Sequence, residues 1–287
     1  MLVDIFCHVD DFCKLLEKEV GKKLIGNNQN AGRKARLEMS EILTIIIYFQ
    51  FSSYKTFKHY YLFHVQTHLK SEFPRLVSYN RFVELMQLAM IPLILYFKIF
   101  GTQDCTEISI IDSIPIKVCH IKREYSNKVF KGLANKGKTS VGWFFGFKIH
   151  FTINHHGEII DLFITPGNVA DNNPDIVDKI TQNIFGKLLA DKGYIGLFER
   201  LYERGIQLIH KIKSNMKNKL MEMFDKLLLK KRGTIESVIN ILKNTFNIEH
   251  SRHRSPINFI VNIFSALFAY NLKPNKPSFD FLKSLDI

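Results

Sequence analysis

The feature that most constrains the fold is the side-chain alternation between Trp143 and Asn154. Aromatic and branched apolar residues occupy every second position, and glycine, lysine, histidine and threonine occupy the positions between them. Because successive side chains of a β-strand point to opposite faces of a sheet, this period of two predicts a long strand. A turn signal, Asn-His-His-Gly at 154–157, and a second strand-like run at Glu158–Thr165 follow it.

The rest of the chain divides at Gly101. Before it, Ser40 and Ser78 each precede an apolar stripe at i, i+3, i+4 spacing, so both are expected to cap helices. After it, three more strands and four helices are expected. The strands are Glu107–Ile116, ended by Pro115, Lys187–Asp191 and Gly205–His210, and the helices are Asn173–Asn183, Gly196–Arg204, Thr234–Phe246 and Pro256–Leu272.

This order of elements predicts a fold of the α+β or α/β class. We expect a ribonuclease-H-like, mixed five-stranded sheet flanked by helices and preceded by an all-helical N-terminal domain. The expected domains are residues 1–100, for DNA binding or assembly, and residues 101–287, a catalytic domain that includes the C-terminal helices.

The charge balance favours a polyanionic partner. The chain has 40 Lys and Arg against 27 Asp and Glu, a formal charge of +13. Such a surplus is typical of proteins that bind nucleic acid, because each phosphate contact releases counterions. A protein that is basic for other reasons stays an alternative on charge alone.

Cysteine usage and hydropathy indicate a reducing compartment. The four cysteines form no Cys-x-x-Cys pair, so buried free thiols are favoured over a zinc site at Cys7 and His8. The start of the chain lacks the basic stretch of a signal peptide, and the longest apolar runs are shorter than the ~20 residues that span a bilayer. We therefore expect a cytoplasmic, nucleoid-associated prokaryotic protein with no membrane partner.

Two aspartates interrupt apolar strands. Asp112 lies within an isoleucine-rich run, and Asp191 ends Lys187–Asp191 just before Gly193. A carboxylate in a strand whose other residues are apolar and expected to be buried needs a partner or a metal ion. Oxygen ligands of this kind suit magnesium. Taken singly, either aspartate is better explained as a strand-end residue that caps a turn.

Glu236 supplies a third carboxylate. It lies on the polar side of the helix expected at Thr234–Phe246, with Arg232 four positions before it and Lys243 seven positions after it. Seven residues make about two helical turns, so Glu236 and Lys243 point nearly the same way. A solvated helix face with ordinary i, i+4 pairing would also explain this pattern if it stood alone.

Together the three segments resemble the acidic triad of bacterial DDE insertion-sequence transposases. They are Ile111-Asp112-Ser113, Leu189-Ala-Asp-Lys-Gly-Tyr194 and Arg232-Gly-Thr-Ile-Glu-Ser237 with Lys243, and the carboxylates are 79 and 45 positions apart. The similarity is greatest to the insertion-sequence family numbered 982, which Thr165-Pro-Gly-Asn168 with Asp171 and the segment 249–255 also resemble. Leu229 stands where related transposases carry tyrosine.

The resemblance implies metal-dependent phosphoryl transfer on DNA. It makes Asp112, Asp191 and Glu236 the catalytic residues and the ligands of two Mg²⁺ or Mn²⁺ ions. The implied partners are transposon terminal inverted repeats and target DNA, with a homodimer or larger assembly pairing two ends. The expected DNA contacts are Arg232, Lys243, Lys122, Arg123, Arg252 and Arg254.

The basic segment 120–139 is expected to be a flexible loop that contacts DNA, because it begins shortly after Asp112. Six basic side chains and one glutamate lie between His120 and Thr139. Two alternatives to transposition stay open for the whole protein. One is a nuclease of the same fold that does not join DNA, and the other is a catalytically silent DNA-binding remnant of a mobile element.

Overall fold

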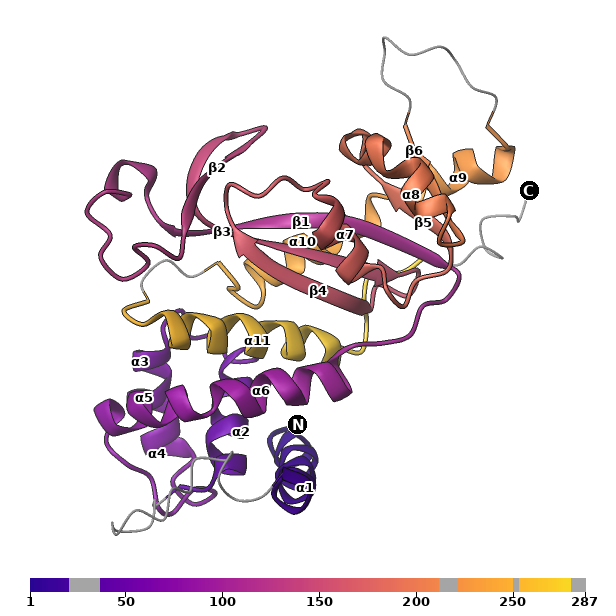
Figure 1. Ribbon diagram of the computed structural model, residues 1–287. Helices are drawn as coiled ribbons and strands as arrows, with labels where there is room; N and C mark the ends of the chain where they lie inside the picture. Colours follow the sequence, from indigo (N-terminus) through magenta and orange to yellow (C-terminus); the bar gives the residue numbers. More distant parts are fainter. Residues whose placement is uncertain (21–36, 212–220, 250–252, 280–287) are drawn as a thin grey trace. The chain divides into compact units, whose positions relative to one another are not determined.

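The computed structural model describes residues 1–20, 37–211, 221–249 and 253–279 (Figure 1). The chain forms two compact units. The first contains Met1–Gly101, Asn244–Ile248 and His253–Leu272, and the second contains Thr102–Lys243, Glu249 and the described residues from Lys273 onward. The first unit is helical, and the second contains all the strands that the structure describes.

Helices build the first unit. They are α1 (Leu2–Val20), α2 (Met39–Phe49), α3 (Phe57–Tyr60), η1 (Tyr61–Val65), α4 (Gln66–His68), α5 (Tyr79–Leu88), α6 (Met90–Tyr96), η2 (Phe97–Gly101) and α11 (Pro256–Leu272). Ser78 caps α5 as predicted, since its hydroxyl accepts a hydrogen bond from the amide of Arg81 (3.4 Å). Ser40 does not cap α2: it lies buried inside the helix, and Glu41 instead accepts from the amide of Glu38 (2.7 Å).

Helix α11 packs with the N-terminal helices, although the sequence placed it at the end of the catalytic domain. It contacts α2, α5 and α6. Gln50, after α2, donates a hydrogen bond to the Ser265 hydroxyl (2.8 Å), and the rings of Tyr96 and Phe268 lie 4.4 Å apart. The reason is that α11 is apolar almost all round, so it needs neighbours on every side.

No single helix within the described ranges is long and apolar enough to cross a membrane. Helix α5 and the segment Met90–Gly101 meet the length and composition criteria only as a pair, bent by 55°.

The second unit is organised by a mixed six-stranded sheet in the order β2-β3-β1-β5-β6, with β4 also paired to β3. Its strands are β1 (Ile108–Cys119), β2 (Asn135–Thr139), β3 (Gly142–Asn154), β4 (Ile159–Pro166), β5 (Gly186–Ala190) and β6 (Ile206–His210). Strands β1, β3 and β4 are antiparallel neighbours, whereas β5 runs parallel to both β1 and β6. This arrangement confirms the predicted ribonuclease-H-like fold class.

Two details of the sheet differ from the sequence prediction. Strand β1 continues through Pro115 to Cys119, because the residues from Asp112 to Cys119 pair with β3, so the proline does not end it. The sixth strand, β2, lies in the segment that was expected to be a flexible loop. It pairs with the start of β3, which extends beyond the end of β4 and would otherwise have an unpaired edge there.

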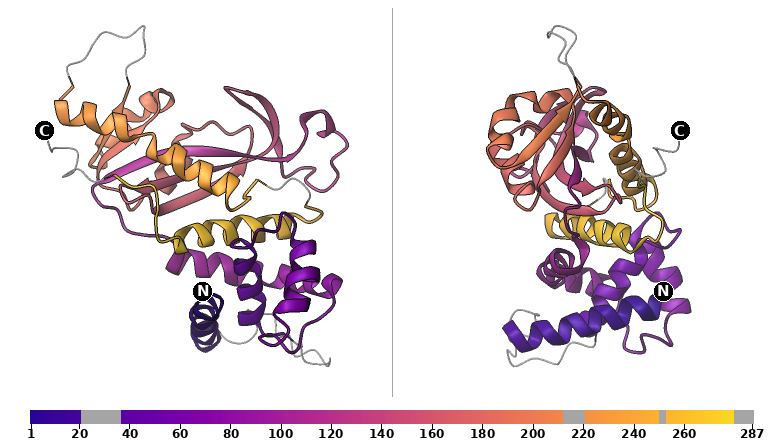
Figure 2. Two further views of the ribbon diagram at one scale, coloured as in Figure 1. Left: turned by 180° about the vertical axis from the view of Figure 1, so that it is seen from behind. Right: turned by 90° about the vertical axis from the view of Figure 1, so that its right-hand side faces the viewer.

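Helices cover both faces of this sheet. They are α7 (Pro174–Ile180), α8 (Phe198–Tyr202), α9 (Met223–Lys231) and α10 (Thr234–Asn244), with the short 3₁₀ segments η3 (Ile121–Arg123) and η4 (Lys192–Leu197). Figure 1 and the view from behind in Figure 2 show α7 on one face and α10 on the other. Buried residues of α7, β5, η4, α8 and β6 form one continuous apolar cluster around Ile111 of β1.

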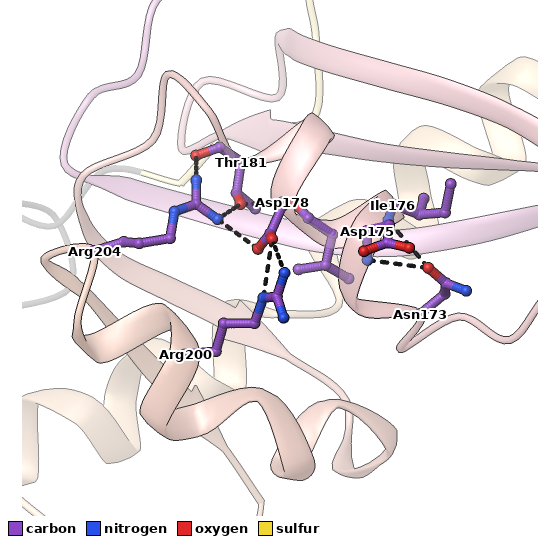
Figure 3. Close-up of polar contacts among 8 residues, drawn as sticks. Asn173, Asp175, Ile176, Asp178, Thr181, Arg200 and Arg204 are labelled. Atoms are coloured by element: carbon purple, nitrogen blue, oxygen red, sulfur yellow. Dashed lines mark hydrogen bonds and ion pairs between the residues drawn. The ribbon is translucent and has the colours of Figure 1, made fainter.

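Polar contacts hold α7 and α8 together, as Figure 3 shows. Asn173 caps α7 by accepting hydrogen bonds from the amides of Asp175 (3.1 Å) and Ile176 (3.2 Å), as predicted. Asp178 binds Arg200 of α8 and also accepts from Arg204 (2.9 Å), and its pKa is lowered, first by the hydrogen bond from Arg200. These contacts fix the segment that begins directly after Asp191.

Candidate active site

The pairing of β1 with β5 brings Asp112 and Asp191 together. The two strands are parallel, and Ile110 lies opposite Leu189. Asp112 lies two residues after Ile110 in β1, and Asp191 lies two residues after Leu189, just beyond the end of β5. Because alternate residues of a strand share a face, both carboxylates point to the face opposite the α7 cluster, at the same level. The β1–β5 register therefore places the two strand-end carboxylates near each other.

Arg232 connects Asp112 to Glu236. It lies between α9 and α10, with its guanidinium 3.7 Å from the carboxylate of Asp112 and 2.9 Å from that of Glu236. Helix α9 is held to β5 by the ion pair of Lys187 with the buried Asp225, which places the start of α10 near the aspartates. The i, i+4 pair of Arg232 and Glu236 is therefore also linked to Asp112, a residue of strand β1.

The carboxylate of Asp112 is poorly solvated. Its pKa is raised to about 6, chiefly by burial; the Ser113 amide and Arg232 lower it in part, and the negative charges of Asp171 and Asp191 add to the increase. The lowering contributions are the smaller ones, so ionised Asp112 is left with an uncompensated energetic cost. A positive ion beside Asp112 and Asp191 would lower that cost.

The opposite face of β1 carries a second polar group, built around Asp171. Its carboxylate accepts hydrogen bonds from the Ser113 hydroxyl (2.6 Å) and from the ammonium of Lys148 (2.9 Å). Lys148 is buried in β3 and also donates to the carbonyl oxygen of Val169 (2.9 Å). A buried ammonium is costly unless it is paired, and here both of its partners come from the loop after β4.

Two further buried polar side chains lie beside this group. His150 shares a hydrogen bond with the Thr165 hydroxyl (2.8 Å), and burial lowers its pKa to about 4. The hydroxyl of Tyr194 is buried, and no described residue forms a hydrogen bond with it. Its pKa is raised well above the usual value, by burial first and then by the nearby charges of Asp112, Asp171 and Asp191.

Lys243 belongs to a different ion cluster at the other end of α10. Its ammonium lies 3.1 Å from the carboxylate of Glu249, and Lys117 of β1 approaches the same carboxylate to 3.8 Å. Lys243 therefore shares the polar side of α10 with Glu236 but about 10 Å further along the helix. Two lysine ammonium groups therefore share the single carboxylate of Glu249, and the cluster keeps a net positive charge.

The carboxylates suit a divalent ion in chemistry, but they do not form a closed ligand set. Asp112, Asp191 and Glu236 offer only oxygen donors, which Mg²⁺ and Mn²⁺ prefer. Across the described parts of the chain, no three His, Cys, Asp or Glu side chains are grouped closely enough to hold a metal ion. Glu236, whose side chain is 64% exposed, is bound to Arg232 instead.

The other predicted DNA contacts are spread over the chain. Lys122 and Arg123 are exposed on η3, directly after β1, and Arg254 is exposed in the first unit. Arg252 lies outside the described residues. The cysteines Cys7, Cys13, Cys105 and Cys119 are free thiols, but only Cys13 is buried, whereas buried thiols were expected.

Lys148, His150 and Tyr194 are site neighbours that were not predicted from the sequence as functional residues. Lys148 and His150 were assigned only to the more polar side of their strand, and Asp171 entered only through the resemblance of its segment. One feature of the sequence could have identified Lys148. Both faces of β3 are buried, so its lysine must find a carboxylate on a neighbouring loop.

Comparison with known proteins identifies the second unit. A family model described as "Transposase DDE domain" matches residues 102–256, which is more than half of the 287-residue chain. No curated protein matches the chain significantly. The matched range begins just before β1 and ends at the start of α11, so it contains Asp112, Asp191, Glu236 and both cations beside Glu236 in the sequence.

Proposed function

The chain belongs to the transposase DDE domain family, and we propose on that basis that it cuts DNA at the ends of a mobile element and joins them to target DNA. Its substrates would be the terminal inverted repeats of that element and a target duplex. The motifs and their intervals favour the insertion-sequence family numbered 982. Pairing two element ends calls for a homodimer or a larger assembly.

Asp112, Asp191 and Glu236 are the proposed ligands of two Mg²⁺ or Mn²⁺ ions. Such ions, when bound, activate the attacking oxygen and stabilise the leaving oxygen of the phosphodiester. Asp112 and Asp191 are already neighbours through the β1–β5 register. Glu236 would have to leave Arg232 to join them, and its exposure leaves it free to turn.

The cations around the carboxylates would hold the DNA backbone. Once released by Glu236, the guanidinium of Arg232 could bind a phosphate with two parallel hydrogen bonds. Lys243, with Lys117, gives a positive region about two helical turns from Glu236. Lys122 and Arg123, together with Arg254 and Arg252, are the further proposed phosphate contacts.

The observation that carries this proposal is the convergence on Arg232. Residues 79 and 45 positions apart along the chain supply two neighbouring aspartates and a glutamate, and one guanidinium bridges Asp112 to Glu236. Structural ion pairs of surface helices do not need a partly buried strand aspartate with a raised pKa.

The test is a cleavage and joining assay on DNA that carries the terminal repeats, with Mg²⁺ or Mn²⁺. Asp112→Asn, Asp191→Asn and Glu236→Gln should each lower cleavage by roughly 10³-fold or more, and metal-free DNA binding should persist. Asp175→Asn, at an exposed position of α7, is the matched control and should keep full activity.

Three outcomes would contradict the proposal in different ways. Undiminished cleavage in the Asp112 or Glu236 variant would remove the assigned residues. Cleavage without any joined product would indicate a nuclease of this fold. DNA binding with no cleavage by the unmodified protein, under any metal, would indicate a catalytically silent remnant.

A further inference from the structure

The hairpin of β2 and β3 presents an exposed aromatic ring between two lysines. Trp143 is 57% exposed, and the ammonium groups of Lys136 and Lys138 lie 5.2 and 5.6 Å from its ring centre. Lys138 is the register partner of Trp143, and Lys136 is two residues away on the same strand, so all three side chains are on one face.

The other face of this hairpin is firmly packed. Phe144, the neighbour of Trp143, is 2% exposed. Gly137 approaches the loop after β4 so closely that a Cβ would lie 2.2 Å from the carbonyl oxygen of Gly167. The hairpin is therefore anchored from behind, and the exposure of Trp143 is a property of a fixed strand.

The surroundings of Trp143 are strongly positive. All six lysine and arginine side chains between His120 and Thr139 are exposed, and Figure 1 shows this segment extending away from the rest of the sheet. The six are Lys122, Arg123, Lys128, Lys131, Lys136 and Lys138. The single carboxylate of the segment, Glu124, lies 3.6 Å from Lys136, so most of the positive charge is not neutralised.

We propose that Trp143 is a stacking platform for an unpaired DNA base and that Lys136 and Lys138 bind the phosphates beside that base. An exposed indole between ammonium groups meets both parts of a nucleotide, since the base stacks on the ring while the phosphates neutralise the lysines. The base must be unpaired, because a base inside a duplex is already stacked on both sides. This inference rests on the proposed DNA-processing function.

The sheet connects this platform to the carboxylates. Strand β3 runs from Trp143 to Phe151, which is the register partner of Asp112. Eight residues of extended strand span about 27 Å, and DNA of that length contains about eight base pairs. One DNA molecule can therefore reach both places, with the stacked base well outside the proposed cleavage position.

Trp143 is the only tryptophan of the chain, so its fluorescence reports on this position alone. The experiment titrates the full-length protein, without metal, with two sets of oligonucleotides. One set is fully paired, and the other carries unpaired bases at an end or in a bulge. The proposal expects the emission to be quenched by DNA with unpaired bases and to change much less with the fully paired set.

The DNA affinities of protein variants are measured by the fluorescence anisotropy of labelled DNA. Trp143→Ala should weaken binding of DNA with unpaired bases about 5-fold or more, and Tyr202→Ala, an equally exposed aromatic on α8, should leave it unchanged. Lys136→Ala with Lys138→Ala should reduce the slope of log affinity against log salt by about 2. Circular dichroism and thermal unfolding confirm that each variant is folded.

The outcomes separate the platform from the proposed function. DNA binding with unchanged emission, or equal affinities for Trp143→Ala and the parent protein, would overturn the stacking platform and leave the transposase proposal standing. A protein that binds no DNA of either kind would overturn both. Equal quenching by paired and unpaired DNA would also reject the requirement for an unpaired base.

Discussion

The two faces of β1 differ in how well the charges on them are paired. On one face, the partly buried carboxylate of Asp112 lies beside Asp191, and the Ser113 amide hydrogen bond and the 3.7 Å approach of Arg232 offset only part of the cost of its charge. On the other, Ser113 donates to Asp171, which also accepts from Lys148 at 2.9 Å. The same strand therefore carries one undercompensated acidic cluster and one cluster whose charges are paired.

This difference separates a reactive group from a structural one. A carboxylate that binds a cation must be costly without it, because full pairing with the protein would remove the gain from binding. A lysine buried in a central strand is tolerated only when it is fully paired. We therefore expect substitutions on the Asp171 face to change stability and substitutions on the Asp112 face to change activity.

Lys148→Met should have the largest effect on folding. It leaves the Asp171 carboxylate and the Val169 carbonyl without the ammonium, and we expect a loss of about 3 kcal/mol in the free energy of unfolding. Urea denaturation measures it. Lys117→Met, which removes an exposed lysine 3.8 Å from Glu249, is the control and should cost less than about 1 kcal/mol. Equal losses in both variants would contradict the comparison.

His150 should make the same face sensitive to acid. Its pKa in the folded protein is about 4, below the usual 6.5, so neutral His150 favours the folded state above pH 6.5 and this stability is lost as the pH falls toward 4. The expected loss between pH 7 and pH 5 is about 2 kcal/mol. His150→Asn should remove this part of the pH dependence, and His156→Asn, in the exposed turn after β3, should not.

Arg232→Met should lower the rate of DNA cleavage by roughly 10- to 100-fold, because it removes the guanidinium proposed to bind a phosphate beside Asp112 and Glu236. The melting temperature should change little, since the Glu236 carboxylate, 64% exposed, stays solvated without its partner. Arg232→Lys, which keeps the charge but not the two-pronged geometry, should give an intermediate rate. A stability loss as large as that of Lys148→Met would mean that Arg232 is structural.

Asp112→Asn should stabilise the metal-free protein while removing its activity. The pKa of Asp112 is raised to about 6, chiefly by burial, so the parent protein loses stability as the pH rises from about 4 to about 6, and asparagine carries no charge to bury. We expect the melting temperature to rise by about 2 °C or more at pH 8 and by about half as much at pH 5. A lower melting temperature at both pH values would show that the carboxylate is needed for folding.

Much of the fold follows from local patterns. The alternation in β3, the Asn173-Pro174 helix start and the helix at Pro256–Leu272 could all be predicted, because each depends on residues close in sequence. The extent of β1 could not, since Pro115 ends a strand in isolation but is tolerated where β3 pairs with the residues around it. Strand β2 has no apolar pattern, and it forms because β3 offers it an edge.

The candidate site follows from the sequence in its proposed residues and not in its contacts. The motifs predict Asp112, Asp191 and Glu236 as site residues, and the β1–β5 register accounts for the proximity of the first two. The ion pair that ties Glu236 to Arg232 follows from i, i+4 spacing, but its extension to Asp112 depends on how α9 is held to β5. The Lys148–Asp171 pair joins a strand to a loop, which no local pattern encodes.

The composition of the first unit has a consequence for how the protein is made. Helix α11 belongs with helices that end at Gly101, yet the ribosome adds its last residue, Leu272, 171 residues later. At translation rates of 5–20 residues per second, the N-terminal helices wait roughly 10 to 30 s for that partner. During this interval the apolar side chains that α11 will cover stay open to water and to chaperones.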